Sequence, residues 1–447
     1  MRFAEPISFS VIFPFVNQMI EELGVTSDPK ELGYYSGFVE GVFALAQFCT
    51  VCFWGSLSDR IGRRPVLIVG LCGVITSTIM FGLSKSFPMM LVSRALSGAL
   101  NGNVAVIKSV LGEITDETNQ GVAFAYLPLC WSIAQRSVAF SLTLLNVILL
   151  CLVLSTIGLI AGILFLEETL PKNKPSSSQN GERRPLLASN PLNNSRYSAS
   201  TERSFPNPRL PSPDTCGSAA DDTEKEAPSV KEIMRIPSIR KVLFSYGFMA
   251  YVTVSINAVL VLWLYTPVNS GGIGFDSAEI GATLTLSGIF GTAIAVIVFP
   301  PLERRVGAVA LYRFGMVMQV LNVLAFPLSH ALALAGGKKG AYLGAAAVLV
   351  VRCIASMVFV CNMLLVTRSA PCRRALGTVN GLAQMVASAS RAVGPAIATS
   401  LFALSVKNGV LGGNLVWLVL STVAFLGVIA ACYIPKDHML RDTESNR

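Results

Sequence analysis

The sequence predicts an all-α membrane protein, built from twelve apolar spans in two halves of six. Of its 447 residues, 52% are hydrophobic and only 14% are charged, whereas soluble domains carry about a quarter charged residues. The apolar residues gather in runs of about 20, the length that crosses a bilayer as a helix. Basic residues cluster in short loops between these runs, so the net charge of +9 indicates membrane orientation rather than nucleic-acid binding.

The apolar runs define the predicted spans and their order along the chain. Three basic loops, 55–64, 302–313 and 368–374, belong on the cytoplasmic side, because cytoplasmic loops are enriched in lysine and arginine. An even number of spans must then separate these loops, so 122–139 and 142–166 count as two spans. The predicted spans are 3–20, 34–54, 65–84, 88–108, 122–139, 142–166, 242–264, 280–299, 311–329, 341–361, 377–404 and 415–433.

Between the sixth and seventh runs the composition changes to serine, proline, asparagine and charged residues. Such a segment cannot bury enough apolar surface to fold, so we expect it to be disordered. An even number of preceding spans places it in the cytoplasm. The predicted organisation is a first half at 1–170, a disordered cytoplasmic linker at 171–236, a second half at 237–435 and a cytoplasmic tail at 436–447.

The loop 55–64 has the sequence GSLSDRIGRR. Its glycines allow tight turns, its aspartate can cap a helix, and its arginines can bind carboxylates or phosphates. On charge alone, an ordinary cytoplasmic loop with turn glycines is the alternative. The full spacing G-x-L-x-D-R-x-G-R-R resembles the loop between helices two and three of the major facilitator superfamily of transporters. The resemblance makes this loop a candidate gate, formed by Gly55, Asp59, Arg60, Gly62, Arg63 and Arg64.

Three charged residues lie within the first apolar runs, where charges usually face a bundle interior. Glu40 could instead extend to the membrane interface, and Arg94 could belong to a structural ion pair. Arg94, with Gly98 and Gly102 after it, resembles the superfamily's helix-four motif, whose arginine is associated with proton coupling. The resemblance implies a proton-coupling role for Arg94, and we expect Glu5 and Glu40, as charged groups within apolar runs, to couple protons with it.

Two apolar runs depart from the family's pattern. In related proteins more residues precede RFAEPI, so we expect a truncated helix one in 3–20. In 122–139, LPLCWSIA resembles the start of helix five, but the glycine–proline run that follows in drug–proton antiporters is missing. A damaged helix five would favour a second interpretation, a non-transporting or defective paralogue or isoform that acts as a membrane scaffold or sensor.

A weak internal repeat supports the two halves. LVSRALSG around Arg94 aligns without a gap on LVVRCIAS around Arg352. Parallel repeats of this kind build the central cavity of such transporters. PPLERRVG at 300–307 resembles a decayed copy of the loop 55–64, with Arg304 where Asp59 would align, so we expect it to contribute less to gating.

Polar and small residues inside the apolar runs are the remaining candidates. Gly98 and Gly102 allow close helix packing, and Gly394 with Pro395 can bend a helix. The pattern NG…RAVGP in 377–404, together with RFAEPI, GYYSGFVE, LNGN and LCWSI, resembles the plant zinc-induced facilitator-like proteins and their fungal relatives. Most polar residues at helix contacts are only structural. The candidate substrate-cavity residues are Asn17, Asn103, Asn257, Asn362, Gln384 and Arg391.

The resemblance implies a secondary transporter of the drug–proton antiporter type, with proton-coupled efflux or antiport of small organic molecules or ions. Its partners would be the lipid bilayer, the substrate and protons, and we expect a monomer. We predict no enzyme activity, cofactor or metal site, because the chain has only two histidines and no nucleophile–base constellation. The linker contains no histidine, so zinc transport is poorly supported.

The predicted location is a multi-pass position in a vacuolar, endosomal or plasma membrane. ERRPLL at 182–187 resembles an acidic dileucine sorting signal for endosomes or vacuoles. So short a motif also occurs by chance, which leaves the plasma membrane as the alternative.

Overall fold

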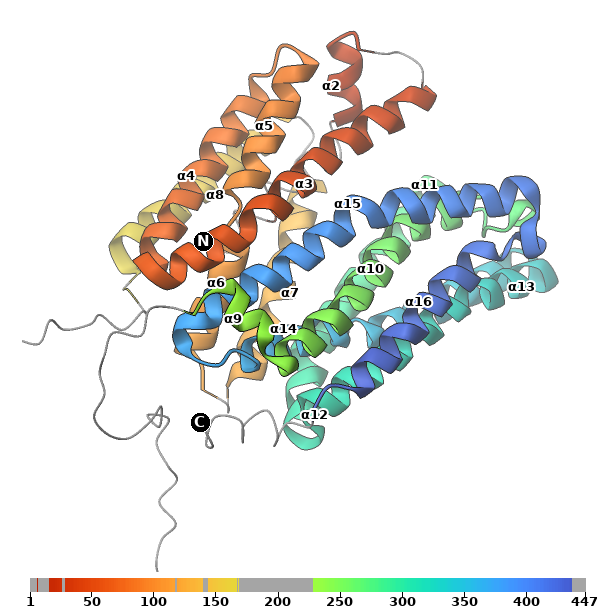
Figure 1. The fold of residues 1–447 in the computed structure, drawn as a ribbon. Coiled ribbons are helices and arrows are strands. Elements are labelled where there is room, and N and C mark those ends of the chain that lie inside the picture. Colours follow the sequence, from red (N-terminus) through yellow and green to blue (C-terminus); the bar gives the residue numbers. More distant parts are fainter. Residues whose placement is uncertain are drawn as a thin grey trace, which may run out of the picture.

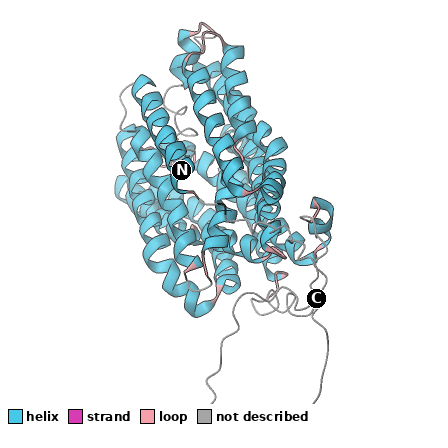
Figure 2. Cartoon of the chain, turned by 90° about the vertical axis from the view of Figure 1, so that its left-hand side faces the viewer, coloured by secondary structure: helices cyan, strands magenta, loops and turns pink. Residues whose placement is uncertain are grey.

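The computed structural model describes Pro6 and residues 16–25, 29–116, 119–139, 144–166, 168 and 228–435. Glu5, the tail 436–447 and most of the predicted linker lie outside the described residues. Within them the chain is almost entirely helical and has no strand (Figure 2). The helices of the first half are α2 Val16–Glu22, α3 Pro29–Ile61, α4 Arg63–Gly82, α5 Phe87–Leu100, α6 Asn103–Ile114, α7 Gln120–Ala139 and α8 Leu144–Phe165.

The second half is preceded by a short helix within the predicted linker, α9 Val230–Arg235. A π-helical segment, Ile294–Val298, continues α11 into α12. The remaining helices are α10 Pro237–Tyr265, α11 Ser277–Ala293, α12 Phe299–Val306, α13 Ala308–Ala355, α14 Met357–Arg368, α15 Leu376–Asn408 and α16 Leu415–Cys432, with short 3-10 turns at Val268–Ser270, Arg373–Ala375 and Val410–Gly413.

Every predicted span after the first coincides with a helix or a helix pair, and α7 passes without interruption through Pro128. In the described residues, eight helical stretches are long and apolar enough to cross a membrane. One of them, Ala308–Arg368, contains two predicted spans, which a non-helical Gly337 with φ 56° separates. In α7 and α8 the apolar stretches found are shorter, Gln120–Cys130 and Cys151–Leu164. The total of twelve spans stays a prediction.

The predicted span 88–108 is broken into α5 and α6 at Asn101 and Gly102. Gly102 lies so close to α3 that a Cβ atom there would collide with the Trp54 side chain. A Cβ atom on Gly98, one turn earlier, would likewise collide with the Phe43 carbonyl of α3. The two small residues therefore let α3 pack directly against the break.

The helices of the two halves separate toward one end of the molecule and meet at the other (Figure 1). At the meeting end, α3 packs along α15, and α6 and α7 contact α14, α15 and α12. The loops that join α3 to α4 and α14 to α15 lie here, and both are rich in arginine. We call this end of the molecule the basic end.

Apolar clusters lie within each half and also between the halves. In the second half, Trp263 of α10, Phe326 of α13 and Trp417 of α16 stack around one core, with Phe326 and Trp417 ring centroids 4.4 Å apart. In the first half, Ile20, Phe81 and other side chains form a smaller cluster between α2, α3, α4, α5 and α8. A further apolar cluster joins the halves, where Phe124, Ala125 and Leu127 of α7 pack with buried side chains of α10, α12, α13, α14 and α15. The polar contacts between the halves form the candidate site.

Candidate functional site

Asp59, near the end of α3, joins the first half to the start of α15. Its carboxylate accepts hydrogen bonds from the backbone N–H groups of Gly377 at 2.8 Å and Thr378 at 2.6 Å, and from the Thr378 hydroxyl at 2.6 Å. An anion at a helix N-terminus satisfies backbone donors and interacts favourably with the helix dipole. Asp59 is only 2% exposed, so these contacts are made away from water.

Arg63, the fully buried arginine at the start of α4, extends this contact. Its Nη1 donates to Asp59 at 2.6 Å and to the Ser58 hydroxyl at 2.7 Å. Its Nε and Nη2 donate to one oxygen of Glu113 on α6 at 3.0 and 2.8 Å, and Nη2 also reaches the Arg373 carbonyl at 3.1 Å. One guanidinium thus connects α3, α4 and α6 to the loop before α15. We call Ser58, Asp59, Arg63, Glu113 and Thr378 the Asp59–Arg63 network.

The other residues of the loop 55–64 have different positions. A Cβ on Gly55 would collide with the Gly377 carbonyl, so Gly55 permits the contact between α3 and α15. Gly62 has φ 107° at the start of α4, where Glu168 accepts hydrogen bonds from the backbone N–H groups of Arg63 at 2.8 Å and Arg64 at 3.1 Å. The side chain of Arg64 donates to the Ile163 carbonyl on α8.

A second polar contact joins the halves at the basic end. Arg368, the last residue of α14, donates to Glu303 of α12 at 3.0 Å and to the Gln120 side chain of α7 at 2.9 Å. Gly121 lies against Glu303, where a Cβ would come within 2.9 Å of its carboxylate. The carboxylate here belongs to the loop that resembles a decayed copy of 55–64.

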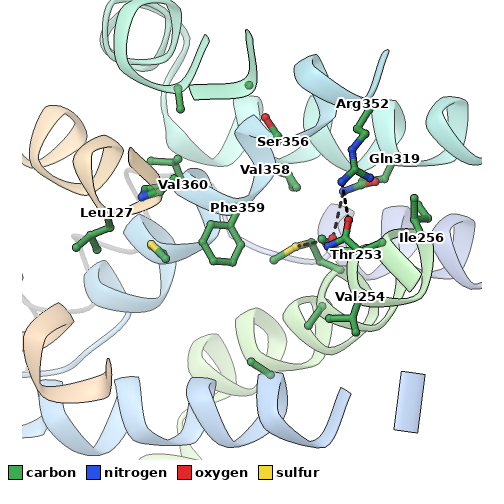
Figure 3. A pocket seen from close by; sticks show the side chains of 18 of the residues that line it. Leu127, Thr253, Val254, Ile256, Gln319, Arg352, Ser356, Val358, Phe359 and Val360 are labelled. Atoms are coloured by element: carbon green, nitrogen blue, oxygen red, sulfur yellow. Dashed lines mark hydrogen bonds between the residues drawn. The ribbon is translucent and has the colours of Figure 1, made fainter. Parts of the chain in front are cut away.

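A cavity of about 430 Å³ lies between the halves (Figure 3). It is lined by residues of α6 and α7 from the first half and by α10, α11, α13, α14 and α15 from the second. Of the candidate cavity residues, Asn257, Gln384 and Arg391 line it. Asn103 and Asn362 are buried elsewhere, and the side chain of Asn17 is outside the described part.

Three basic residues line the cavity, and the sequence predicted only one of them, Arg391, as a cavity residue. Besides Arg391, the cavity is lined by Lys108, at the end of a predicted span, and Arg352, known from the sequence only as the repeat partner of Arg94. Lys108 Nζ donates to Gln384 Oε1 at 3.2 Å, and Arg352 Nη2 donates to Asn257 Oδ1 at 2.7 Å. A cation within an apolar run was the signal that could have identified both.

Glu40 and Arg94 lie in another part of the first half. The Arg94 guanidinium is buried between the rings of Phe43 and Phe81, with its carbon atom 5.3 Å from each ring centroid, which is cation–π distance. Glu40 interacts electrostatically with both Arg94 and Arg391. The structure therefore brings Glu40 near a cavity arginine, whereas Arg94 does not line the cavity.

Gly394 and Pro395 lie within α15 where this helix passes α10. A Cβ on Gly394 would come 3.3 Å from the Ser255 hydroxyl, and the Ser255 hydroxyl donates to the Gly394 carbonyl at 3.5 Å. Among the residues that the structure describes, no group of three or more His, Cys, Asp or Glu side chains is arranged to hold a metal ion.

Comparisons with known proteins agree with this architecture. The multidrug transporter mfsB of Aspergillus fumigatus is 28% identical, over 99% of this chain and 83% of its own. The transporter psiT2 of Psilocybe cyanescens is 30% identical, over 96% and 87%, and Zinc Induced Facilitator 1 of Arabidopsis thaliana is 26% identical, over 94% and 87%.

Two solved structures share the fold. The human organic anion transporter MFSD10 has a TM-score of 0.69 at 19% identity and covers 96% of both chains. A bacterial homologue of the iron transporter ferroportin, in an outward-facing state, has a TM-score of 0.64 at 14% identity, over 100% of this chain and 98% of its own.

Residues 1–395 match a family model described as the Major Facilitator Superfamily. This family consists of membrane transporters, so the expectation that the chain is not an enzyme is confirmed. The chain belongs to the Major Facilitator Superfamily.

Proposed function

We propose that this protein exports small organic molecules in exchange for protons by alternating access. The observation that carries the proposal is the Asp59–Arg63 network, which closes the basic end beneath a cavity lined by both halves. Names of related proteins support export: one relative is called a multidrug transporter and another, from Aspergillus niger, an efflux pump.

In the proposed cycle, the arrangement described here is the state that is closed at the basic end. To open at the basic end, the protein must separate α3 from α15. This separation breaks the hydrogen bonds between Asp59 and the start of α15. Because a packed interface has discrete arrangements, loss of these bonds favours a second state rather than a gradual deformation. Substrate and protons drive the exchange by binding one of the two states more tightly.

Glu40 is the proposed proton carrier, with Glu5 as a further candidate from the sequence. Glu40 lies on α3, and its charge is attracted by Arg94 in its own half and by Arg391 on α15 of the other half. Protonation removes its negative charge and therefore both attractions. The proton would thus change the electrostatic attraction between the halves, which is the link that antiport requires.

We predict that Glu40→Gln uncouples transport from the pH gradient. Purified protein in vesicles should accumulate at least one of two fluorescent probes, the anion fluorescein or the cation rhodamine 123, when a pH gradient is applied. Glu40→Gln should abolish the acceleration by the gradient and retain exchange of probe for probe, since only the titratable group is lost.

Glu21→Gln is the control for this experiment, because it removes an exposed carboxylate at the end of α2. Its transport should match wild type. A wild-type response to the gradient in Glu40→Gln would exclude Glu40 as the proton carrier. Absence of transport of both probes by the wild type would favour the scaffold or sensor interpretation.

A further inference from the structure

We infer that the cavity between the halves binds a small organic anion, held by Lys108, Arg352 and Arg391. The inference rests on the proposed transport function, because it names the class of substrate that this cavity would take. Four features of the cavity carry it: the sign of its charges, the setting of Arg352, a buried acceptor without a donor, and an apolar wall.

The charges on the cavity wall are of one sign. Lys108, Arg352 and Arg391 line it, and among the described lining residues there is no aspartate or glutamate. A cavity lined by one sign of charge, with walls of low dielectric constant, concentrates ligands of the opposite sign. The wall therefore favours anionic ligands and disfavours cationic ones.

Arg352 is the clearest of the three cations. Its Nη2 donates to Asn257 Oδ1 at 2.7 Å, and no carboxylate in the described part of the chain forms an ion pair with it. An amide oxygen orients the guanidinium but does not neutralise it. A guanidinium has five N–H donors in a planar fork, which fits a carboxylate, sulfonate or phosphate.

The hydrogen bonds beside Arg352 indicate a second property of the ligand, a hydrogen-bond donor. Gln319 donates to the Thr253 hydroxyl at 3.3 Å and accepts from Asn322 Nδ2 at 3.4 Å. Figure 3 shows Arg352, Gln319 and Thr253 at the same side of the cavity. Asn322 is 2% exposed, and its Oδ1 has no hydrogen-bond partner among the described residues. Buried acceptors are normally satisfied, so the ligand would supply a hydroxyl or N–H donor here.

The opposite side of the cavity is apolar. Figure 3 shows Leu127, Phe359 and Val360 away from Arg352, around the other part of the space. Together with a volume of about 430 Å³, this wall suits an organic body rather than an inorganic ion. The fitting ligand is a small organic acid with an apolar part and a hydrogen-bond donor.

The position of the cations gives the anion a role in the cycle. Lys108 belongs to α6 of the first half, whereas Arg352 and Arg391 belong to α13 and α15 of the second. A bound anion would attract both halves at once and offset the repulsion among the cations. It would therefore favour the state in which both halves close on it.

Fluorescence polarisation with the full-length protein in detergent, without any gradient, tests this inference. Fluorescein and rhodamine 123 share a three-ring core but have opposite charges. Fluorescein should bind and rhodamine 123 should bind at least about tenfold more weakly. Arg352→Gln should weaken fluorescein binding by about tenfold or more, since hydrogen bonds to charged groups contribute about 1.5–3 kcal/mol. Arg352→Lys, which keeps the charge, should restore part of the affinity.

Arg240→Gln is the matched control, because it removes the same charge from an exposed position on α10 outside the cavity. Its affinity for fluorescein should be that of the wild type. If Arg352→Gln does not give monodisperse protein, Lys108→Gln takes its place with the same expected loss. Three results would each overturn the inference: no fluorescein binding to the wild type, equal affinity for rhodamine 123, or unchanged affinity in the folded cavity variant.

The outcomes of the binding test and the transport test distinguish failure of the anion site from failure of the proposed export. If fluorescein binds through Arg352 but no probe is transported, the proposed export is wrong and the anion site remains. If rhodamine 123 is transported and fluorescein neither binds nor is transported, export remains and the anion site is wrong.

Discussion

Arg63 is the residue on which the contact at the basic end depends. Its guanidinium donates to two carboxylates, a hydroxyl and a backbone carbonyl, and its side chain is fully buried. Removal of one partner of a buried charge pair leaves the other charge uncompensated, which costs about 3–5 kcal/mol. The acidic and basic residues of the network therefore stabilise the closed basic end only as a set.

We predict that Asp59→Asn lowers the thermal unfolding temperature of the purified protein and opens the basic end. The amide keeps the shape of the side chain, but it loses the charge that pairs with Arg63 and the start of α15. Arg60→Gln, at an exposed position in the same loop, should change the stability by less than about 0.5 kcal/mol. A similar loss in both variants would contradict the network as the source of stability.

The sequence identified Asp59 and Arg63 because they belong to a spaced motif. It did not identify Glu113, Thr378 or Lys108, whose partners lie in distant parts of the chain. A single sequence contains no record of such pairs. Local spacing therefore predicted one side of the contact, and the fold was needed to find the other side.

At the scale of elements, the crossing of α3 and α15 is set by small residues. Gly55 of α3 lies against Gly377 and Gly381 at the start of α15, and any side chain there would strike backbone. Hydrophobic runs predicted both helices, because about 20 apolar residues are a strong signal. They did not predict the break between α5 and α6, where Trp54 of α3 packs against Gly102.

We predict that Gly55→Ala destabilises the closed basic end and reduces probe transport, since its Cβ would collide with the Gly377 carbonyl. Overpacking of this kind costs about 1–3 kcal/mol. Gly41→Ala on the same helix is the control, because a Cβ there would meet nothing within 4 Å. Thermal unfolding and vesicle uptake measure both effects, and equal behaviour of the two variants would refute the close crossing.

The whole molecule combines a closed basic end with a cavity between the halves. Both features use residues from α3 or α6 on one side and from α15 on the other. The family and its helical spans could be predicted from the sequence, because composition and local motifs carry them. The cationic wall of the cavity could not, since it needs the relative positions of α6, α13 and α15.

We expect the basic end to open when the Asp59–Arg63 network is broken. Double electron–electron resonance between spin labels at Arg60 and Pro371, both exposed at this end, measures it directly. We expect one short label-to-label distance in otherwise unmodified protein and an added longer distance in Asp59→Asn. A single unchanged distance in folded protein of both kinds would contradict it.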